Sequence, residues 1–252
     1  MPALARIASE LLGVSCVSAT DCLAVGDQTN LSSGRSLTLV ESWNGSTWST
    51  VPSPTANGDN FLSGVSCISA TACTAAGQFT FGSFHTAPLI ESWNGTRWSV
   101  VPAPNKAESG YLNGISCASA DACVAVGTYL GHVSAENKTL IESWNGSHWS
   151  IEPVTGRQSR LLGVSCVSAS TCKAAGNDWN KSFNAQTFVE SWNGTAWSIE
   201  PTPNNGSAAA SVNSLDAVSC ASASFCAAVG GYGPANGHLA FYTLAETGTS
   251  GG

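Results

Sequence analysis

Ten cysteines are the most regularly spaced reactive residues of this chain. They form five pairs, each with five residues between its members: Cys16/Cys22, Cys67/Cys73, Cys117/Cys123, Cys166/Cys172 and Cys220/Cys226. A structural zinc site needs four ligands, but each pair offers two thiols and no histidine in a matching position. If the two members lie on neighbouring strands of a hairpin, their β-carbons come within bridging distance. We therefore predict five disulfides, and disulfides form and persist in oxidising compartments.

A tryptophan-rich phrase is the second candidate for chemistry. It reads E-S-W-N-G-x-x-W-S and begins at Glu41, Glu91, Glu142 and Glu190. On an extended strand Glu41 and Trp43 point to the same face. The tryptophan could stack on a sugar in every repeat, or it could pack between two sheets while the glutamate holds an indole N–H or a backbone donor. We favour packing, because a ligand platform alone would not need the whole phrase.

These residues belong to a repeat with a period near 50, which lies in the range of propeller blades. Successive first cysteines are 51, 50, 49 and 54 residues apart. The runs "LLGVSC", "CLAVG" and "LTLVESW" read as strands, Asn-Gly signals a hairpin, and a proline stops "WSTVP". Each repeat therefore predicts four antiparallel strands, A to D, with hairpins A–B and C–D, and the chain should contain very little helix.

The two ends of the sequence complement each other. Residues 3–9 precede the first A strand, whereas the last repeat lacks the W-N-G-x-x-W phrase and a D strand. We predict that residues 3–9 supply this D strand and close a ring. The expected fold is one all-β domain over residues 1–247, a five-bladed β-propeller of four-stranded blades, with a flexible tail at 248–252. The expected blades span about 11–54, 61–104, 111–154, 160–203 and 214–247.

The repeat resembles known propeller families. The stretch "WNGSTWSTVPSP" looks like the outer-strand phrase of kelch repeats, and W-N-G-x-x-W is similar to the W-D-G-x-x-W phrase of some bacterial propeller lectins. Five blades are the number of the tachylectin-2 type, and the whole pattern resembles secreted actinobacterial repeat proteins. The resemblance covers residues 1–247 and implies propeller blades, not a particular activity.

Binding residues are expected where the repeats differ. In a propeller the B–C and D–A connections share one end, and here they vary while the A–B and C–D turns are nearly invariant. Aromatic faces with a few amide and hydroxyl groups suit a small polar ligand such as a sugar, although any single ring could simply pack a loop down. The candidate ligand-binding residues are Asp27, Phe61, Ser63, Gln78, Phe79, Tyr111, Asn113, Tyr129, Arg160, Asn177, Trp179, Asp216 and Tyr232.

Catalysis has less support in the sequence. Five-bladed glycosidases carry inward-facing carboxylates on successive inner strands, where this chain has Leu12, Ser63 and Asn113. Three carboxylates could still meet where the last blade joins the first, namely Glu10, Asp27 and Asp216. The four histidines share no register. We therefore predict no catalytic, metal-binding or cofactor-binding residues, and keep a glycoside hydrolase or lyase near the central channel as an alternative.

Composition excludes some partners. The net charge is −7 and the nine Lys and Arg residues are scattered, so a nucleic-acid partner is not expected. No apolar run reaches the length of a membrane span. The first residues contain no apolar signal-peptide core. Either the chain is cytosolic, or it is a secreted or cell-surface protein whose signal peptide is absent from the sequence, and the cysteine pairs favour the second reading.

The favoured function is that of a secreted, monomeric, non-catalytic lectin that binds carbohydrate or another small polar ligand through the variable end. The alternative is a secreted or cell-envelope scaffold that binds a protein, for example a cell-surface protein, through the same face. The variable loops share no common residue set. A single asymmetric site therefore fits better than five equivalent ones.

Overall fold

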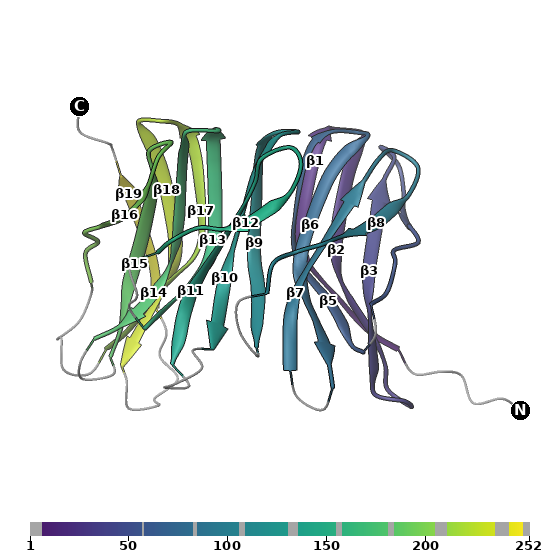
Figure 1. Cartoon of the computed structure of the whole chain (residues 1–252), viewed down its shortest axis with the longest axis horizontal. Helices are drawn as coiled ribbons and strands as arrows, with labels where there is room; N and C mark the ends of the chain where they lie inside the picture. The colour runs from purple at the N-terminus through teal and green to yellow at the C-terminus, as the bar shows by residue number, and fades with distance from the viewer. Residues whose placement is uncertain are drawn as a thin grey trace, which may run out of the picture.

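The computed structural model of this protein describes residues 7–56, 58–82, 85–105, 109–130, 136–154, 158–180, 184–204, 211–234 and 242–248. Every regular element in these ranges is a β-strand, as the sequence predicts. Five antiparallel sheets, numbered here as blades 1 to 5, follow one another along the chain from purple to yellow in Figure 1. The all-β architecture of propeller blades is therefore confirmed.

Blades 1 to 3 each have four strands in sequence order. Blade 1 contains β1 (Ile7–Ser18), β2 (Asp21–Asn30), β3 (Arg35–Trp43) and β4 (Trp48–Thr50). Blade 2 contains β5 (Asn60–Ser69), β6 (Ala72–Phe81), β7 (His85–Trp93) and β8 (Trp98–Val101). Blade 3 contains β9 (Gly110–Ser119), β10 (Ala122–Leu130), β11 (Asn137–Trp144) and β12 (Trp149–Ile151).

The last two blades differ in strand number. Blade 4 contains β13 (Ser159–Ser168), β14 (Thr171–Trp179), β15 (Ala185–Trp192) and β16 (Trp197–Glu200). Blade 5 has three strands in its described part, β17 (Ser211–Ser222), β18 (Phe225–Pro234) and β19 (Tyr242–Gly248). Gly248 pairs with Cys226 at the end of β19, so the predicted tail begins within a strand, and residues 249–252 lie outside the described residues.

The Asn-Gly hairpin is a four-residue loop rather than a two-residue turn. Trp43 and Trp48 form the last pair of β3 and β4, and the loop lies between them. The Asn44 side-chain oxygen accepts hydrogen bonds from the backbone N–H of Ser46 and of Thr47, both at 3.0 Å. Gly45 has a φ of 90°, which a residue with a β-carbon adopts only with strain. The phrase N-G-x-x therefore encodes this loop in blades 1 to 4.

All five predicted disulfides are present. In each A–B hairpin the two cysteines lie opposite each other, with Cα atoms 3.9 to 4.0 Å apart. The bridges are Cys16–Cys22, Cys67–Cys73, Cys117–Cys123, Cys166–Cys172 and Cys220–Cys226. No cysteine is left free in the described part of the chain. Because each bridge closes a loop with a sequence separation of 6, the chain-entropy model gives about 2 kcal/mol of stabilisation per bridge.

The two cysteines of each pair differ in burial, which the spacing alone does not predict. The first member is exposed in blade 1 and half-buried in the other blades, whereas the second member, on strand B, is buried in every blade. Cys172, for example, is 2% exposed and packs in the core between blades 3 and 4. The buried second members are therefore core residues as well as disulfide partners, and they are Cys22, Cys73, Cys123, Cys172 and Cys226.

Neighbouring blades join through their A strands in the same way at each junction. Gly13 of β1 lies so close to Gly64 of β5 that a β-carbon on Gly13 would come within 2.9 Å of the Gly64 Cα atom. Two residues further along β1, the Ser15 hydroxyl accepts a hydrogen bond of 3.0 Å from the Cys67 N–H. The equivalent serines of blades 2, 3 and 4 accept from the next blade's cysteine at 3.0, 2.9 and 3.0 Å, and they are Ser66, Ser116 and Ser165.

Closure of the ring by residues 3–9 is not confirmed. Ile7–Ser9 belong to β1 and pair with β2, and residues 3–6 lie outside the described residues. β1 packs on β5 and β17 packs on β13, but the described residues show no packing of similar extent between the first and last sheets. Val14 is accordingly 63% exposed, whereas its blade 2 counterpart Val65 is 8% exposed. The described blades form an open arc.

Candidate functional site

The predicted binding residues lie at the end of the sheets where the B–C and D–A connections run, which we call the loop end. The register pairs several of them across strands A and B, as in Phe61 with Gln78 and Arg160 with Asn177. Because the candidates come from five successive blades of an open arc, the structure does not bring all thirteen together. It does bring some together within single blades.

Blade 4 holds the best-formed cluster at the loop end. The Arg160 Nε–H donates a hydrogen bond of 3.0 Å to the Asn177 side-chain oxygen. The Arg160 guanidinium carbon lies 5.5 Å from the centre of the Trp179 ring, within the range of a cation–π contact. Asn177 is buried, whereas Arg160 and Trp179 are half-buried. An aromatic ring, an amide and a guanidinium therefore share one patch near the end of β14.

Three other candidate rings pack between blades. Phe79, Tyr129 and Tyr232 lie against the cores of the blade 1/2, 2/3 and 4/5 interfaces, respectively. Tyr232 also stacks on Tyr242 with ring centres 5.2 Å apart. These rings hold the loop end down and are only partly accessible to a ligand.

The remaining candidates are polar or half-buried positions. The Asn113 amide donates 2.7 Å to the Leu161 carbonyl and so links blade 3 to blade 4. Asp216 is exposed and accepts a hydrogen bond of 2.8 Å from the Ser214 hydroxyl. Four further candidates are half-buried at the same end, namely Phe61, Ser63, Gln78 and Tyr111.

Of the three carboxylates that the sequence suggests could meet, Glu10, Asp27 and Asp216, the first two are neighbours. Glu10 lies opposite Asp27 in blade 1. Burial and the charge of Glu10 raise the pKa of Asp27, and a hydrogen bond from Thr29 acts in the opposite direction. Asp216 lies in blade 5, which does not pack on blade 1 among the described residues, so the predicted group of three does not form there. No group of three or more metal-ligating side chains is found in the described ranges.

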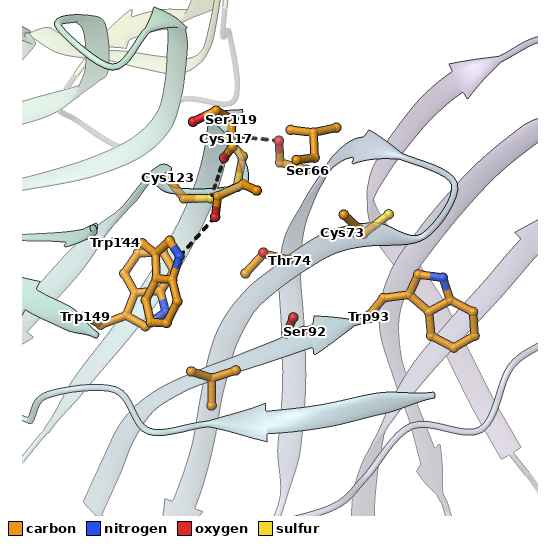
Figure 2. Close-up of a pocket in the computed structure, with 14 residues that line it drawn as sticks. Ser66, Cys73, Thr74, Ser92, Trp93, Cys117, Ser119, Cys123, Trp144 and Trp149 are labelled. Carbon is orange, nitrogen blue, oxygen red and sulfur yellow. Dashed lines mark hydrogen bonds between the residues drawn. A yellow bond between two sulfur atoms is a disulfide. The ribbon is translucent and has the colours of Figure 1, made fainter. Parts of the chain in front are cut away.

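Two related clefts lie at the opposite end, the turn end, which carries the A–B and C–D turns. The cleft between blades 2 and 3 has a volume of about 190 Å³ (Figure 2). Blade 2 contributes the hydroxyls of Ser66, Thr74 and Ser92, and blade 3 contributes Trp144 and Trp149. A second cleft of about 230 Å³ repeats this arrangement between blades 3 and 4. Sequence reasoning missed both clefts because it searched only the loop end.

The tryptophans of the repeated phrase have structural partners. The first one of each phrase donates its indole N–H to a carbonyl in the A–B turn of its own blade at 3.1 Å, as Trp43 does to Ala19. The second one packs toward the preceding blade, and Trp98 is 4% exposed while Trp48 of blade 1 is 44% exposed. The first tryptophans of blades 2 to 4, Trp93, Trp144 and Trp192, also lie against the cores between blades, so packing between sheets is confirmed for these blades. The prediction that the glutamate holds an indole N–H is wrong.

The glutamates of the phrase are instead buried between blades. Glu91, Glu142 and Glu190 are at most 1% exposed, and burial raises their pKa values to about 7, 8 and 7. The Ser53 hydroxyl donates 2.5 Å to Glu91, and this bond partly opposes the rise. Glu142 has no hydrogen-bond partner on either carboxyl oxygen. In the repeat, Ala103 of blade 2 stands to Glu142 of blade 3 as Ser53 of blade 1 stands to Glu91 of blade 2. Alanine has no hydroxyl, so it cannot donate a hydrogen bond to Glu142.

A third cleft, of about 350 Å³, lies between blades 4 and 5. Lys173 on its wall pairs with Glu200 and donates 2.7 Å to the Ser191 hydroxyl. Burial opposes ionisation of Glu200, but hydrogen bonds from Lys173 and Ser191 and the Lys173 charge outweigh it, so the pKa of Glu200 is lowered. This cleft thus combines an ion pair with apolar walls.

Comparisons with known proteins support the fold only. No protein-family model matches the chain, and no curated protein is similar to it in sequence. Solved propeller structures of similar fold include YCF48 bound to D1 peptide, with a TM-score of 0.51, 12% identity and coverage of 90% of this chain and 65% of that chain. The GH74 xyloglucanase from Xanthomonas campestris also matches, with a TM-score of 0.45, 11% identity and coverage of 96% of this chain and 47% of that chain, so this chain spans less than two thirds of the length of either protein. No helix long and apolar enough to cross a membrane occurs among the described residues.

Proposed function

We propose that this protein is a non-catalytic binding module that recognises carbohydrate, or another small polar ligand, at its loop end. The observation that carries the proposal is the Arg160, Asn177 and Trp179 cluster of blade 4. The half-buried Trp179 indole supplies an apolar surface for a sugar ring, and the Arg160 guanidinium, which lies over the indole, supplies hydrogen-bond donors. The other blades place different residues at these positions, so one asymmetric site is proposed rather than five.

The same reasoning gives the environment and the assembly state. Five disulfides suggest an oxidising environment, and we propose a secreted or cell-surface location for the protein. We also propose that the protein acts as a monomer. A glycoside hydrolase or lyase is the weaker alternative, and the facing carboxylates Glu10 and Asp27 of blade 1 would be its candidate acid and base.

A glycan-array screen of the oxidised protein tests the proposal. We expect a selective signal that Trp179→Ala weakens by about fivefold or more, because the stacking of a sugar on one indole contributes about 1 kcal/mol or more. Tyr232→Ala is the matched control, since this ring packs between blades 4 and 5 and should affect stability rather than sugar binding. A folded protein that gives no signal, or a signal that Trp179→Ala leaves intact, would contradict the proposal.

Protein binding at the same end is the second candidate. Phe81 is 38% exposed and lies between Phe79 and His85, with ring centres 6.1 and 5.6 Å apart. This group of neighbouring rings offers an apolar contact surface to a partner protein. One solved structure of similar fold, YCF48, is bound to a peptide. Pull-down from cell-surface extracts that Phe81→Ser abolishes and Trp179→Ala preserves would favour this candidate.

A further inference from the structure

The cleft between blades 2 and 3 contains two neighbouring hydroxyls that have no protein partner. Thr74 on β6 lies directly opposite Ser92 on β7, so the two side chains point to the same face of blade 2. Both residues are half-buried and line the cleft. Neither hydroxyl forms a hydrogen bond with another residue in the described ranges (Figure 2). The cleft therefore offers a pair of adjacent groups that can each donate and accept a hydrogen bond.

The serine of this pair differs from its counterparts in the other blades. In blades 1, 3 and 4 the serine at the repeat position of Ser92 shares a hydrogen bond with a neighbouring side chain. The pairs are Ser42–Ser49, Ser143–Glu152 and Lys173–Ser191. Only in blade 2, among the described blades that carry this serine, is the hydroxyl left for a ligand.

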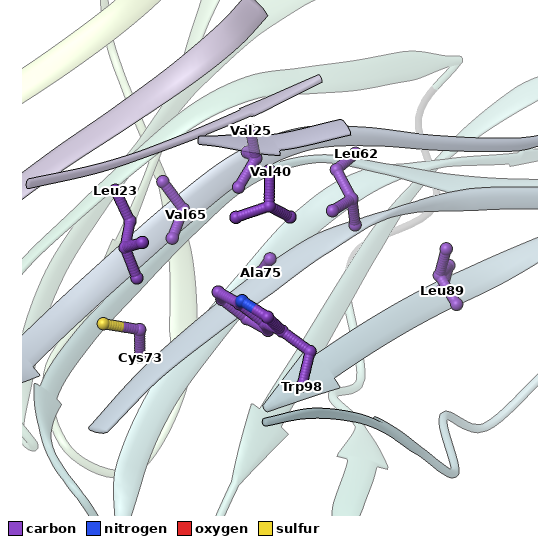
Figure 3. Packing of buried hydrophobic residues seen from close by; sticks show 9 residues of the cluster. All are labelled: Leu23, Val25, Val40, Leu62, Val65, Cys73, Ala75, Leu89 and Trp98. Carbon is purple, nitrogen blue, oxygen red and sulfur yellow. The ribbon is translucent and has the colours of Figure 1, made fainter. Parts of the chain in front are cut away.

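The threonine is an exception as well. At the position of Thr74, blade 1 carries Leu23 and blade 3 carries Val124, while blade 4 carries Lys173. Leu23 is buried together with Trp98 in the core between blades 1 and 2 (Figure 3), and Val124 belongs to the core between blades 3 and 4. Packing of a blade junction is thus served by an apolar residue here, and the Thr74 hydroxyl needs another explanation.

Blade 3 supplies the opposite wall of the cleft. Trp144 and Trp149 line it with ring centres 5.8 Å apart, and they face Thr74 and Ser92 across the cleft (Figure 2). The Trp144 N–H donates 3.1 Å to the Ala120 carbonyl, and Trp149 packs in the buried cluster between blades 2 and 3. Both rings are therefore held in place by the fold, and an aromatic wall is present before a ligand binds.

The cleft contains no charge. Its fourteen lining residues all lie in the described ranges, and none of them is charged. The neighbouring cleft between blades 3 and 4 is lined by Asp121 and Glu152 instead. A carboxylate can only accept hydrogen bonds and an ammonium group can only donate them, and either ion would lose hydration without meeting an opposite charge. A ligand hydroxyl, in contrast, can accept from one side chain of the Thr74 and Ser92 pair and donate to the other.

We propose that this cleft is a second carbohydrate site, which binds one neutral sugar ring. The apolar C–H face of the sugar packs on the indole wall, and its hydroxyls bind Thr74 and Ser92. The cleft volume of about 190 Å³ is below the range of roughly 300–1,000 Å³ for drug-sized ligands, so a single ring fits better than a longer chain. The site lies at the turn end and does not depend on the Arg160 cluster at the loop end.

The test uses the full oxidised protein, labelled with ¹⁵N, and the methyl glycosides of glucose, galactose and mannose as probes. Titration followed by nuclear magnetic resonance should give saturable shifts of the Trp149 indole N–H and the Thr74 amide signals for at least one probe. The uronic acid form of the same sugar should bind at least about fivefold more weakly, because its carboxylate meets no cation in the cleft.

Protein variants test the role of the hydroxyl. Thr74→Val removes it at nearly constant shape and should weaken binding about fivefold. Thr74→Leu introduces the residue that blade 1 carries at this position, so it should fill the cleft and abolish binding while the protein stays folded. Ser42→Ala is the matched control, because it removes the serine hydroxyl of the same repeat position from blade 1, and it should leave binding unchanged.

This proposal and the proposed function can fail separately. The indole N–H signals of Trp149 and Trp179 report the turn-end cleft and the loop-end cluster, respectively. A sugar that shifts the Trp179 signal and not the Trp149 signal would overturn the second site and leave the proposed function standing. Absence of saturable shifts at Trp149 up to about 20 mM sugar, or binding that Thr74→Leu leaves unchanged, would also overturn the second site.

Discussion

The Glu142→Gln variant should be more stable than the parent protein at high pH and almost unchanged at low pH. Glu142 lies between blades 2 and 3, is 0% exposed and has no hydrogen-bond partner on either carboxyl oxygen. Burial raises its pKa from 4.5 to about 8. Between these two pH values the folded state keeps a proton that the unfolded state releases, so the free energy of unfolding falls as pH rises.

The size of the effect follows from the pKa difference. Each pH unit in this window costs about 1.4 kcal/mol, so ionisation of Glu142 costs about 5 kcal/mol in total. The stabilisation is complete below pH 4.5 and is lost as pH rises through about 8. Glutamine has nearly the same shape and never ionises. The variant should therefore match the parent at pH 4.5 and exceed its stability by about 4 kcal/mol at pH 8.

Urea denaturation of the oxidised proteins at pH 4.5, 6, 7 and 8 measures this difference, with tryptophan fluorescence as the signal. Glu41→Gln is the matched control, because Glu41 holds the same repeat position in blade 1, where no described blade precedes it, and is half-buried. That variant should follow the parent at every pH. A stability difference for Glu142→Gln that is the same at pH 4.5 and pH 8 would refute the reasoning.

Two further predictions concern the blade interiors. Ala103→Ser restores the hydroxyl that Ser53 provides at the preceding junction; it should lower the pKa of Glu142 and flatten the pH dependence of stability, as urea midpoints at pH 6 and 8 would show. Replacing Cys117 and Cys123 together by serine should lower the free energy of unfolding by at least about 2 kcal/mol, because the bridge is lost and a hydroxyl takes the place of the buried Cys123 sulfur. A midpoint unchanged by the serine pair would contradict the chain-entropy estimate.

Local features were predictable because they depend on residues close together in the sequence. The strands, the Asn44 loop and the five Cys-Cys pairs follow from alternation, from turn chemistry and from a fixed short separation. The glycine after the B-strand alanine or valine is explained only by the structure, where a β-carbon on Gly26 would lie 2.0 Å from the Glu10 carbonyl oxygen. A single repeat thus carries nearly all the information needed for one blade.

Features that depend on two blades were harder to predict. The role of Glu142 depends on Ala103, which lies 39 positions earlier in the preceding blade. The burial of Cys172 likewise depends on packing against blade 3 and not on its spacing from Cys166. The sequence suggests Asn113 as a ligand-binding residue, but its amide donates to the Leu161 carbonyl of the next blade. Ring closure depends on the angle between successive blades, and the sequence pattern within one repeat does not predict this angle.

The junction between A strands has a direction. A serine hydroxyl of one blade accepts from a cysteine N–H of the next, and the same step recurs at each of the four junctions. Because each blade contacts the next through this same head-to-tail junction, each junction rotates one blade relative to the previous one by a similar angle. The number of blades that completes a circle depends on that angle. The glycines at the step admit the closest approach, while blade 5 carries Ala217 there, 3.1 Å from a β-carbon placed on Gly163. Substitutions at these positions would therefore change the curvature of the arc, and with it the number of blades in a closed ring, while leaving each blade intact.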